Sequence, residues 1–180
     1  MRIIGGAFKS RVFRPAKNFK ARPTTDFARE NLFNILENRY DFENKKMLDL
    51  FSGTGSISFE FVSRGCPDVT CVESDRFHYQ FICSVIETLG IKRELKALHV
   101  DAFKFIDRSP GTFDLIFADP PYELSRIAEI PDLILNTNLL GNEGLLILEH
   151  GKTNDFSHHP LFRELRKYGS VHFSFFSRVQ

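Results

Sequence analysis

Four consecutive residues, Asp119-Pro-Pro-Tyr122, have side chains and a backbone suited to chemistry on the amine of a nucleobase. Such an amine is a poor nucleophile because its lone pair is delocalised into the ring. The Asp119 carboxylate and the Pro120 carbonyl can accept its two hydrogens, which aims the lone pair at an electrophile. Asp119 can also stabilise the positive charge that develops on nitrogen, and Tyr122 can stack on the base. Asp119, Pro120 and Tyr122 are therefore our candidate catalytic residues.

A second group of residues, between positions 49 and 56, could hold the cofactor that such chemistry needs. Gly53 and Gly55 follow an apolar run and precede an amphipathic segment, where glycines let the backbone approach a ligand closely. A dinucleotide-binding loop would carry a third glycine where this chain has Ser58. Asp49 would repel a pyrophosphate but attract an ammonium or sulfonium group. S-adenosylmethionine carries both of these cations, so the residue pattern favours it as the cofactor.

Further acids follow the next two apolar runs. Glu73 stands 18 residues beyond Gly55, where a carboxylate can accept hydrogen bonds from both hydroxyls of a ribose. Asp101 and the backbone N–H of Ala102 follow the third run, where they could bind the adenine edge. Each acid could instead be a surface residue or a helix cap, but a single adenosine-shaped site at the carboxyl ends of parallel strands would account for all of them. We expect cofactor contacts from Asp49, Phe51, Gly53, Gly55, Glu73, Ser74, Asp101 and Ala102.

The elements that would position these residues alternate between strand and helix from residue 46 onward. Strands are expected at residues 47–51, 69–73, 95–100, 113–118 and 145–149, and helices at 56–64, 75–89, 102–107 and 126–138. This alternation predicts a doubly wound α/β fold, in which a parallel sheet carries helices on both faces.

The C-terminal pattern is less regular. Residues 162–167 could form a helix or a strand, and Gly169 suits a turn. Apolar residues then alternate with polar or small ones at Val171, Phe173 and Phe175, which predicts a last strand.

The first 30 residues differ in charge from the rest of the chain. They carry eight Lys or Arg and two acids, a local charge of +6, against −5 for the other 150 residues and +1 overall. The first 24 residues contain no acid, and three phenylalanines, Phe8, Phe13 and Phe19, lie among the bases. This composition suits contact with RNA phosphates and bases, although a solvated basic arm with a few apolar anchors is the alternative.

The same segment also has a structural pattern. Residues 2–4 and 8–14 are expected to pair as a hairpin that turns at Gly5-Gly6. Residues 24–26 then offer side-chain oxygens to cap a helix, whose apolar positions Ala28, Leu32, Ile35 and Leu36 fall on one face.

Length and composition limit the architecture. A chain of 180 residues and 20.8 kDa with 42% hydrophobic residues can fill one core, so we expect a single domain in which residues 46–180 form the cofactor-binding core and residues 1–40 a basic appendage. The chain has no long apolar run and no signal-sequence pattern, so we expect a cytoplasmic protein with no membrane partner. Three cysteines, Cys66, Cys71 and Cys83, form no C-x-x-C pair, which predicts reduced thiols and no metal site.

Together these motifs resemble class I S-adenosylmethionine-dependent methyltransferases that act on exocyclic amines. The N-terminal segments Arg2-Ile-Ile-Gly-Gly6, Arg22-Pro-Thr-Thr-Asp26 and Leu32-Phe-Asn-Ile-Leu36 narrow the resemblance to the bacterial family that methylates N2 of a guanine in 16S ribosomal RNA. Further similarity lies at Ser63-Arg64-Gly65 and Lys167-Tyr168-Gly169, so the resemblance spans nearly the whole chain.

This resemblance implies several properties. The fold would be a Rossmann-like sheet of seven strands with the last strand antiparallel, which favours a strand at residues 162–167. The partner would be 16S ribosomal RNA, within the small ribosomal subunit or its assembly intermediate, and the protein would act as a monomer with S-adenosylmethionine. RNA contacts would come from Arg2, Lys9, Arg11, Arg14, Arg22, Thr24 and Arg29.

Three other hypotheses remain open from the sequence. The same chemistry could act on adenine N6 in DNA or RNA, or on a protein glutamine amide, although 180 residues leave little room for a DNA target-recognition segment. A dinucleotide-dependent oxidoreductase is disfavoured by Asp49 and Ser58. A non-catalytic RNA-binding assembly factor would give the Asp-Pro-Pro-Tyr turn no purpose.

Overall fold

A computed structural model describes residues 1–15, 25–108 and 111–178. In these residues the strands are β1 (Lys46–Leu50), β2 (Asp68–Glu73), β3 (Leu95–His99), β4 (Phe113–Ala118), β5 (Leu140–His150), β6 (Phe162–Tyr168) and β7 (Val171–Ser177). The helices are α1 (Asp26–Glu37), α2 (Ser56–Ser63), α3 (Arg76–Leu89), α4 (Ala102–Arg108) and α5 (Ile130–Leu135), with a 3-10 turn, η1 (Ile127–Glu129), before α5.

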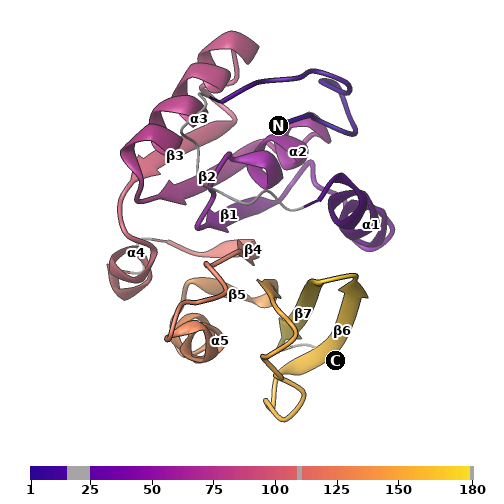
Figure 1. Ribbon diagram of the computed structural model, residues 1–180, viewed down its shortest axis with the longest axis vertical. Helices are drawn as coiled ribbons and strands as arrows, with labels where there is room; N and C mark the ends of the chain where they lie inside the picture. Colours follow the sequence, from indigo (N-terminus) through magenta and orange to yellow (C-terminus); the bar gives the residue numbers. More distant parts are fainter. Residues whose placement is uncertain (16–24, 109–110, 179–180) are drawn as a thin grey trace.

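The strands of the described residues form one sheet in the order β3-β2-β1-β4-β5-β7-β6 (Figure 1). The first five strands in this order, β3, β2, β1, β4 and β5, pair in parallel, whereas β7 runs antiparallel to both β5 and β6. The doubly wound α/β prediction is thus confirmed, as is the antiparallel last strand that the resemblance implied. Residues 162–168 form a strand, which decides between the two structures expected there.

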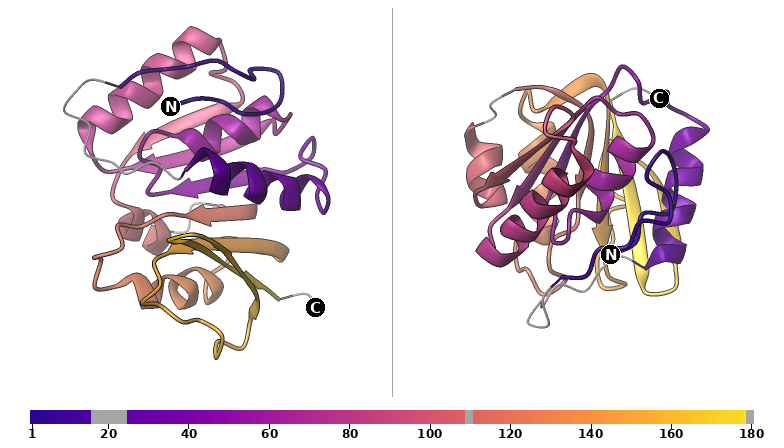
Figure 2. Two further views of the ribbon diagram at one scale, coloured as in Figure 1. Left: turned by 45° about the vertical axis from the view of Figure 1, so that its right-hand side comes forward. Right: turned by 90° about the horizontal axis from the view of Figure 1, so that it is seen from above.

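Helices cover both faces of the sheet (Figure 2). Helices α1, α2 and α3 bury one apolar cluster, in which Phe61 packs between Phe33 and Phe42 with ring centroids 4.9 and 5.1 Å apart. Helices α4 and α5 bury a second cluster on the other face, around Phe105 and Ile130. Burial on both faces explains why the central strands are almost continuously apolar.

Helix ends follow the capping chemistry of the sequence. The Thr25 hydroxyl accepts a hydrogen bond from Ala28 N at the start of α1, and Asp75 accepts two at the start of α3. Helix α5 is shorter than the predicted segment 126–138. Pro131 lacks the N–H that a longer helix would need at that position, so residues 127–129 form only a 3-10 turn and α5 begins at Ile130.

The N-terminal segment pairs as the hairpin prediction expects but reverses through a longer loop. Around an antiparallel bridge between Arg2 and Val12, backbone hydrogen bonds run from Ile3 N to Arg11 O, from Ser10 N to Ile3 O and from Phe13 N to Met1 O. Gly5 and Gly6 lie in the loop between the paired residues, where they also contact α2. Gly6 has a φ of +70°, and a Cβ there would collide with the Ser63 carbonyl oxygen, so only glycine allows this approach.

A buried carboxylate holds this segment in place. Glu60 of α2 accepts hydrogen bonds from Ile4 N at 2.6 Å and Gly5 N at 3.2 Å. The Arg29 guanidinium of α1 lies 3.6 Å from the Glu60 carboxylate and donates to the carbonyl oxygen of Arg2. Residues 1–15, which we call the head, are therefore tied to α1 and α2.

Two further features of the described residues bear on the sequence predictions. No helix among them is long and apolar enough to cross a membrane. The cysteines are free thiols, and burial raises the pKa of Cys66 to about 11, so that thiol stays protonated at neutral pH.

Candidate active site

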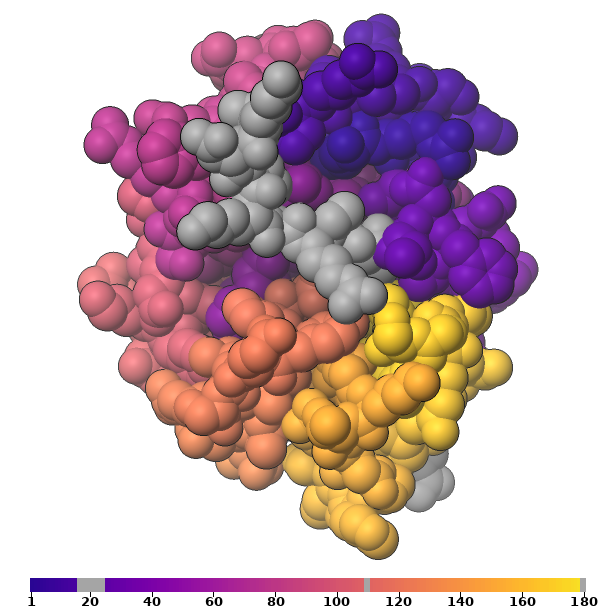
Figure 3. Space-filling model, viewed as in Figure 1, coloured from indigo at the N-terminus to yellow at the C-terminus, as the bar shows by residue number. Residues whose placement is uncertain are grey.

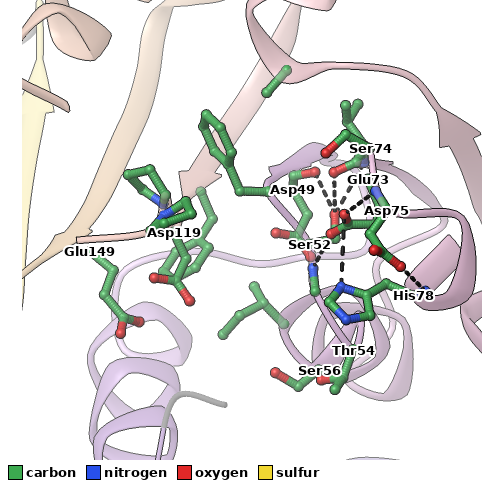
Figure 4. Close-up of a pocket in the computed structure, with 18 of the residues that line it drawn as sticks. Asp49, Ser52, Thr54, Ser56, Glu73, Ser74, Asp75, His78, Asp119 and Glu149 are labelled. Atoms are coloured by element: carbon green, nitrogen blue, oxygen red, sulfur yellow. Dashed lines mark hydrogen bonds and ion pairs between the residues drawn. The ribbon is translucent and has the colours of Figure 1, made fainter. Parts of the chain in front are cut away.

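A cavity of about 480 Å³ opens at the carboxyl ends of β1, β2, β4 and β5 (Figure 4). Its size is within the range of sites for small molecules. It is lined by all three candidate catalytic residues and by seven of the eight predicted cofactor residues: Asp49, Phe51, Gly53, Glu73, Ser74, Asp101 and Ala102. The fold thus brings together at one edge of the sheet side chains that lie far apart in the sequence.

Gly55 is the predicted cofactor residue that does not line the cavity. It is the N-cap of α2 with a φ of +72°, its N–H donates to the carbonyl oxygen of Ser52, and a Cβ there would lie 2.9 Å from the Phe59 ring. Gly55 therefore shapes the loop from behind, while Gly53 faces the cavity.

The loop before α2 has unusual backbone angles. Phe51 has a φ of +60° and Gly53 a φ of +53°, both in the left-handed region. Ser52 ties the loop to β2, because its N–H and its side-chain oxygen both bond to Val72. Left-handed angles are costly for a phenylalanine, and such strain is concentrated at ligand-binding sites.

Asp49 is buried beneath this loop, with 1% of its surface exposed. Its Oδ2 accepts hydrogen bonds from the Ser58 hydroxyl at 2.6 Å and from Ser58 N at 3.2 Å. Loss of water outweighs these bonds and raises the pKa of Asp49 to about 7. A cation in the cavity would stabilise the ionised form of this carboxyl group.

Glu73 lies at the rim of the same half of the cavity. One of its oxygens accepts a hydrogen bond from Gly53 N and the other from Asp75 N, both at 2.7 Å, and His78 Nδ1 lies 3.9 Å away. Backbone donors thus fix the orientation of the carboxylate. Asp101 likewise accepts a hydrogen bond from Lys104 N, so it caps α4 and also faces the cavity.

The Asp-Pro-Pro-Tyr turn forms the opposite wall. Asp119 N donates to the Leu50 carbonyl oxygen at 3.2 Å, which joins the turn to the end of β1. The Tyr122 hydroxyl donates to Glu149 Oε1 at 3.0 Å, and its ring lies against Gly151. Figure 4 shows Asp119 and Glu149 on one side of the cavity, with Asp49 and Glu73 on the other.

The prediction missed several cavity residues. Glu149, near the end of β5, could have been found, because it ends a predicted strand as Glu73 does. Others, such as His78 and Thr25 from helix starts and Val171 from the antiparallel strand, had no signal in the sequence. The remaining unpredicted lining residues are Ser52, Thr54, Ser56, Ile57, Val72, Asp75, Phe117, Pro121 and Glu123.

The predicted RNA contacts divide by exposure. Arg2, Lys9, Arg11 and Arg14 are exposed on the head, part of whose surface is visible at the upper edge of the space-filling view (Figure 3). Arg29 is only 1% exposed, and it donates to Asp26 as well as to Arg2, so its prediction as an RNA contact is wrong. It holds α1 to the head instead. Arg22 and Thr24 lie outside the described residues.

Comparison with known proteins gives consistent matches along the chain. The model of the family described as Conserved hypothetical protein 95 matches residues 1–177. Ribosomal RNA small subunit methyltransferase D of Escherichia coli K12 is 30% identical over 149 residues, which cover 83% of this chain and 74% of that protein. The protein of the same name from Buchnera aphidicola subsp. Baizongia pistaciae is 29% identical, covering 99% of this chain and 92% of its own.

Solved structures agree with this match. A hypothetical protein from Thermus thermophilus superposes with a TM-score of 0.85 at 25% identity, covering 98% of this chain and 99% of that one. The similarity therefore includes the head and the whole sheet.

Proposed function

The chain belongs to the family described as Conserved hypothetical protein 95, and from this membership and the cavity we propose that it is an S-adenosylmethionine-dependent ribosomal RNA methyltransferase. Its target is N2 of a guanine in 16S RNA of the small ribosomal subunit. Support for the RNA comes from relatives named ribosomal RNA small subunit methyltransferase D. Support for the amine comes from the Asp119-Pro-Pro-Tyr122 turn.

One observation carries the proposal. A single cavity has predicted cofactor residues on one wall and the Asp-Pro-Pro-Tyr turn on the other, so a methyl donor and a base could meet between them. Holding two reactants next to each other in a suitable orientation greatly increases the reaction rate.

The donor set suits S-adenosylmethionine. Asp49 is a desolvated carboxyl group that gains from a nearby ammonium or sulfonium cation. Glu73 would accept hydrogen bonds from the ribose hydroxyls, and Asp101 with Ala102 N would hold the adenine edge. When bound, the cofactor supplies a methyl group on a sulfonium whose C–S electron pair remains on sulfur.

The residues of the turn prepare the amine. Asp119 and the Pro120 carbonyl oxygen would accept its two hydrogens, which would leave the nitrogen lone pair aimed at the methyl group that the cofactor supplies. The proton that the nitrogen then loses passes to an Asp119 carboxylate oxygen. Tyr122 stacks on the base and is oriented by its hydrogen bond to Glu149.

The head binds the RNA backbone. Arg2, Lys9, Arg11 and Arg14 are exposed cations on one docked segment, and such cations attract phosphates without regard to sequence. We extend this role to Arg22 and Thr24 from the resemblance alone. The protein acts in the cytoplasm as a monomer of one methyltransferase domain on the small subunit or its assembly intermediate.

The test is transfer of a labelled methyl group to small ribosomal subunits from cells that lack this gene, followed by nucleoside analysis. N2-methylguanosine in the 16S RNA is the expected product. Label on adenine N6 would show that the target is adenine rather than guanine, and this part of the proposal would be overturned. Binding without any transfer would instead favour an assembly factor.

A further inference from the structure

Glu149 lines the cavity but has no direct part in the methyl transfer described above. It lies near the end of β5, is 3% exposed, and stands beside the turn that follows β4. The parallel register pairs Ala118, the last residue of β4, with Leu148 of β5, so Asp119 and Glu149 are the residues that follow this pair. Figure 4 shows both carboxylates on the same side of the cavity.

The Tyr122 hydroxyl fixes one oxygen of this carboxylate. Its hydrogen bond to Oε1 is 3.0 Å long and links the Asp-Pro-Pro-Tyr turn to the end of β5. A carboxylate offers about four lone-pair sites, so Glu149 can accept from a ligand while it accepts from Tyr122. Binding becomes less favourable when a ligand places an acceptor rather than a donor against a buried carboxylate, because neither group then has a hydrogen-bond partner.

The bases that carry an exocyclic amine differ at the neighbouring ring nitrogen. In guanine, N1 beside the 2-amine bears a hydrogen and is a donor. In adenine N1, and in cytosine N3, the nitrogen beside the amine carries a lone pair and is an acceptor. A second carboxylate next to the amine-binding Asp119 therefore suits guanine alone.

We propose that Glu149 is a specificity-determining residue that accepts the N1–H of the target guanine while Asp119 and Pro120 hold the 2-amine. This rests on the proposed function, since it requires a base in the cavity. Adenine or cytosine would place a lone pair against the Glu149 carboxylate, and the enzyme would reject both by leaving that pair of acceptors unsatisfied.

The test uses 2-aminopurine, which has the amine of guanine at the same position but an acceptor at N1. Small subunits are reconstituted with 16S RNA that carries either guanine or 2-aminopurine at the methylated position. The full chain should methylate the 2-aminopurine RNA with a kcat/KM lower by about 10-fold to 10²-fold. Equilibrium binding of the two RNAs with S-adenosylhomocysteine present should show the same preference.

The variant Glu149→Gln has nearly the same volume and still offers an acceptor to Tyr122. Its amide can donate a hydrogen bond to N1 of 2-aminopurine, so the preference should fall to within a few-fold of unity. A purely structural role would lower both rates together and leave the ratio unchanged. Tyr122→Phe is the matched control, because it keeps the Glu149 charge and should keep the preference for guanine while both rates fall.

The outcomes separate the two proposals. If the wild-type chain methylates neither RNA, the proposed function fails. If it methylates guanine and 2-aminopurine equally, or if Glu149→Gln retains the wild-type ratio, the role of Glu149 is overturned while the methyltransferase remains. The comparison of the two RNAs on wild-type protein needs no variant, so a Glu149→Gln chain that failed to fold would not remove the test.

Discussion

In the part of the chain that the structure describes, buried charged side chains lie in two regions, the junction between the head and the helices α1 and α2, and the cavity. At the junction, Glu60 is fully buried but is closely surrounded by backbone N–H groups and the Arg29 guanidinium. At the cavity, Asp49 and Glu149 are nearly as buried but border a space of about 480 Å³. Burial alone therefore does not mark a functional charge, whereas burial beside an open space does.

The difference has a physical origin. A buried charge is costly unless its neighbours satisfy it, and at the junction those neighbours are protein groups whose positions are fixed by the fold. Burial lowers the pKa of Arg29 and raises that of Glu60, and each charge offsets part of the cost of the other. At the cavity, the raised pKa of Asp49 indicates a cost that a cationic ligand would relieve.

The largest expected effect tests the junction. Glu60→Ala leaves the buried Arg29 with Asp26 as its remaining acidic partner, takes one of two acidic partners from Arg64, and leaves two backbone N–H groups without an acceptor, so the free energy of unfolding should fall by about 3–5 kcal/mol. Urea unfolding measures it. Glu37→Ala, which removes only an exposed partner of Arg64, is the control and should change stability little. Similar losses in both variants would contradict the distinction.

The next prediction tests the cavity. Asp119→Ala should lower turnover by about 10²-fold or more, because one group that stabilises the transition state is lost. Affinity for S-adenosylhomocysteine should stay within a few-fold, since Asp119 lies on the wall opposite Asp49 and Glu73. Single-turnover kinetics and calorimetry measure the two quantities. Turnover close to that of the wild type would remove Asp119 from the mechanism.

A smaller effect is expected from pH. Since burial raises the pKa of Asp49 to about 7, the carboxyl group is mostly protonated at pH 5 and ionised at pH 8. A cationic ligand that requires the ionised form should bind about tenfold more tightly for each pH unit up to 7 and level off above it. Calorimetric titration between pH 5 and 8 with S-adenosylhomocysteine, whose cation is its ammonium group, measures this. Asp49→Asn should flatten that part of the profile, and an unchanged slope would assign the dependence to other groups.

The smallest effect concerns the surface of the head. Arg11→Gln should weaken RNA binding a few-fold and reduce the salt slope by about one, as expected for one phosphate contact. Arg29→Met removes an equal charge from a buried position, so it should lower stability without changing that slope. Filter binding at several salt concentrations compares them. Equal slopes for Arg11→Gln and the wild type would exclude Arg11 as a phosphate contact.

The sequence predicted the sheet and the cavity because both depend on local patterns. Alternation of strands and helices sets the topology, and the rule that ligands bind at the carboxyl ends of parallel strands placed Asp49, Glu73, Asp101 and Asp119 at one site. Each of these residues lies in, follows or ends an apolar run, which the sequence displays directly.

The sequence did not predict the surroundings of Arg29, Gly5 and Gly6, because these depend on contacts between residues that are distant in the sequence. Arg29 was predicted as an RNA contact because it is a base in a basic segment. In the structure it is a buried structural residue that pairs with Glu60 of α2. Gly5 and Gly6 were predicted from the sequence as turn residues. The structure shows that they contact Ser63, which lies 58 residues after Gly5 and whose carbonyl oxygen leaves no room for a Cβ at Gly6. The net charge of a segment counts a buried residue such as Arg29 in the same way as an exposed one.

The pairing of β1 with β4 has a consequence for how the protein folds. Lys46 N donates to Asp114, 68 residues later, and the register continues to Leu50 and Ala118 beneath the cavity. The two walls of the cavity are thus brought together by a contact that is slow to form, because a long loop must close first. A nascent or partly unfolded chain that lacks this pairing can form the β1–β2–β3 side of the cavity but not the turn opposite it, so catalytic competence requires β1 to pair with β4.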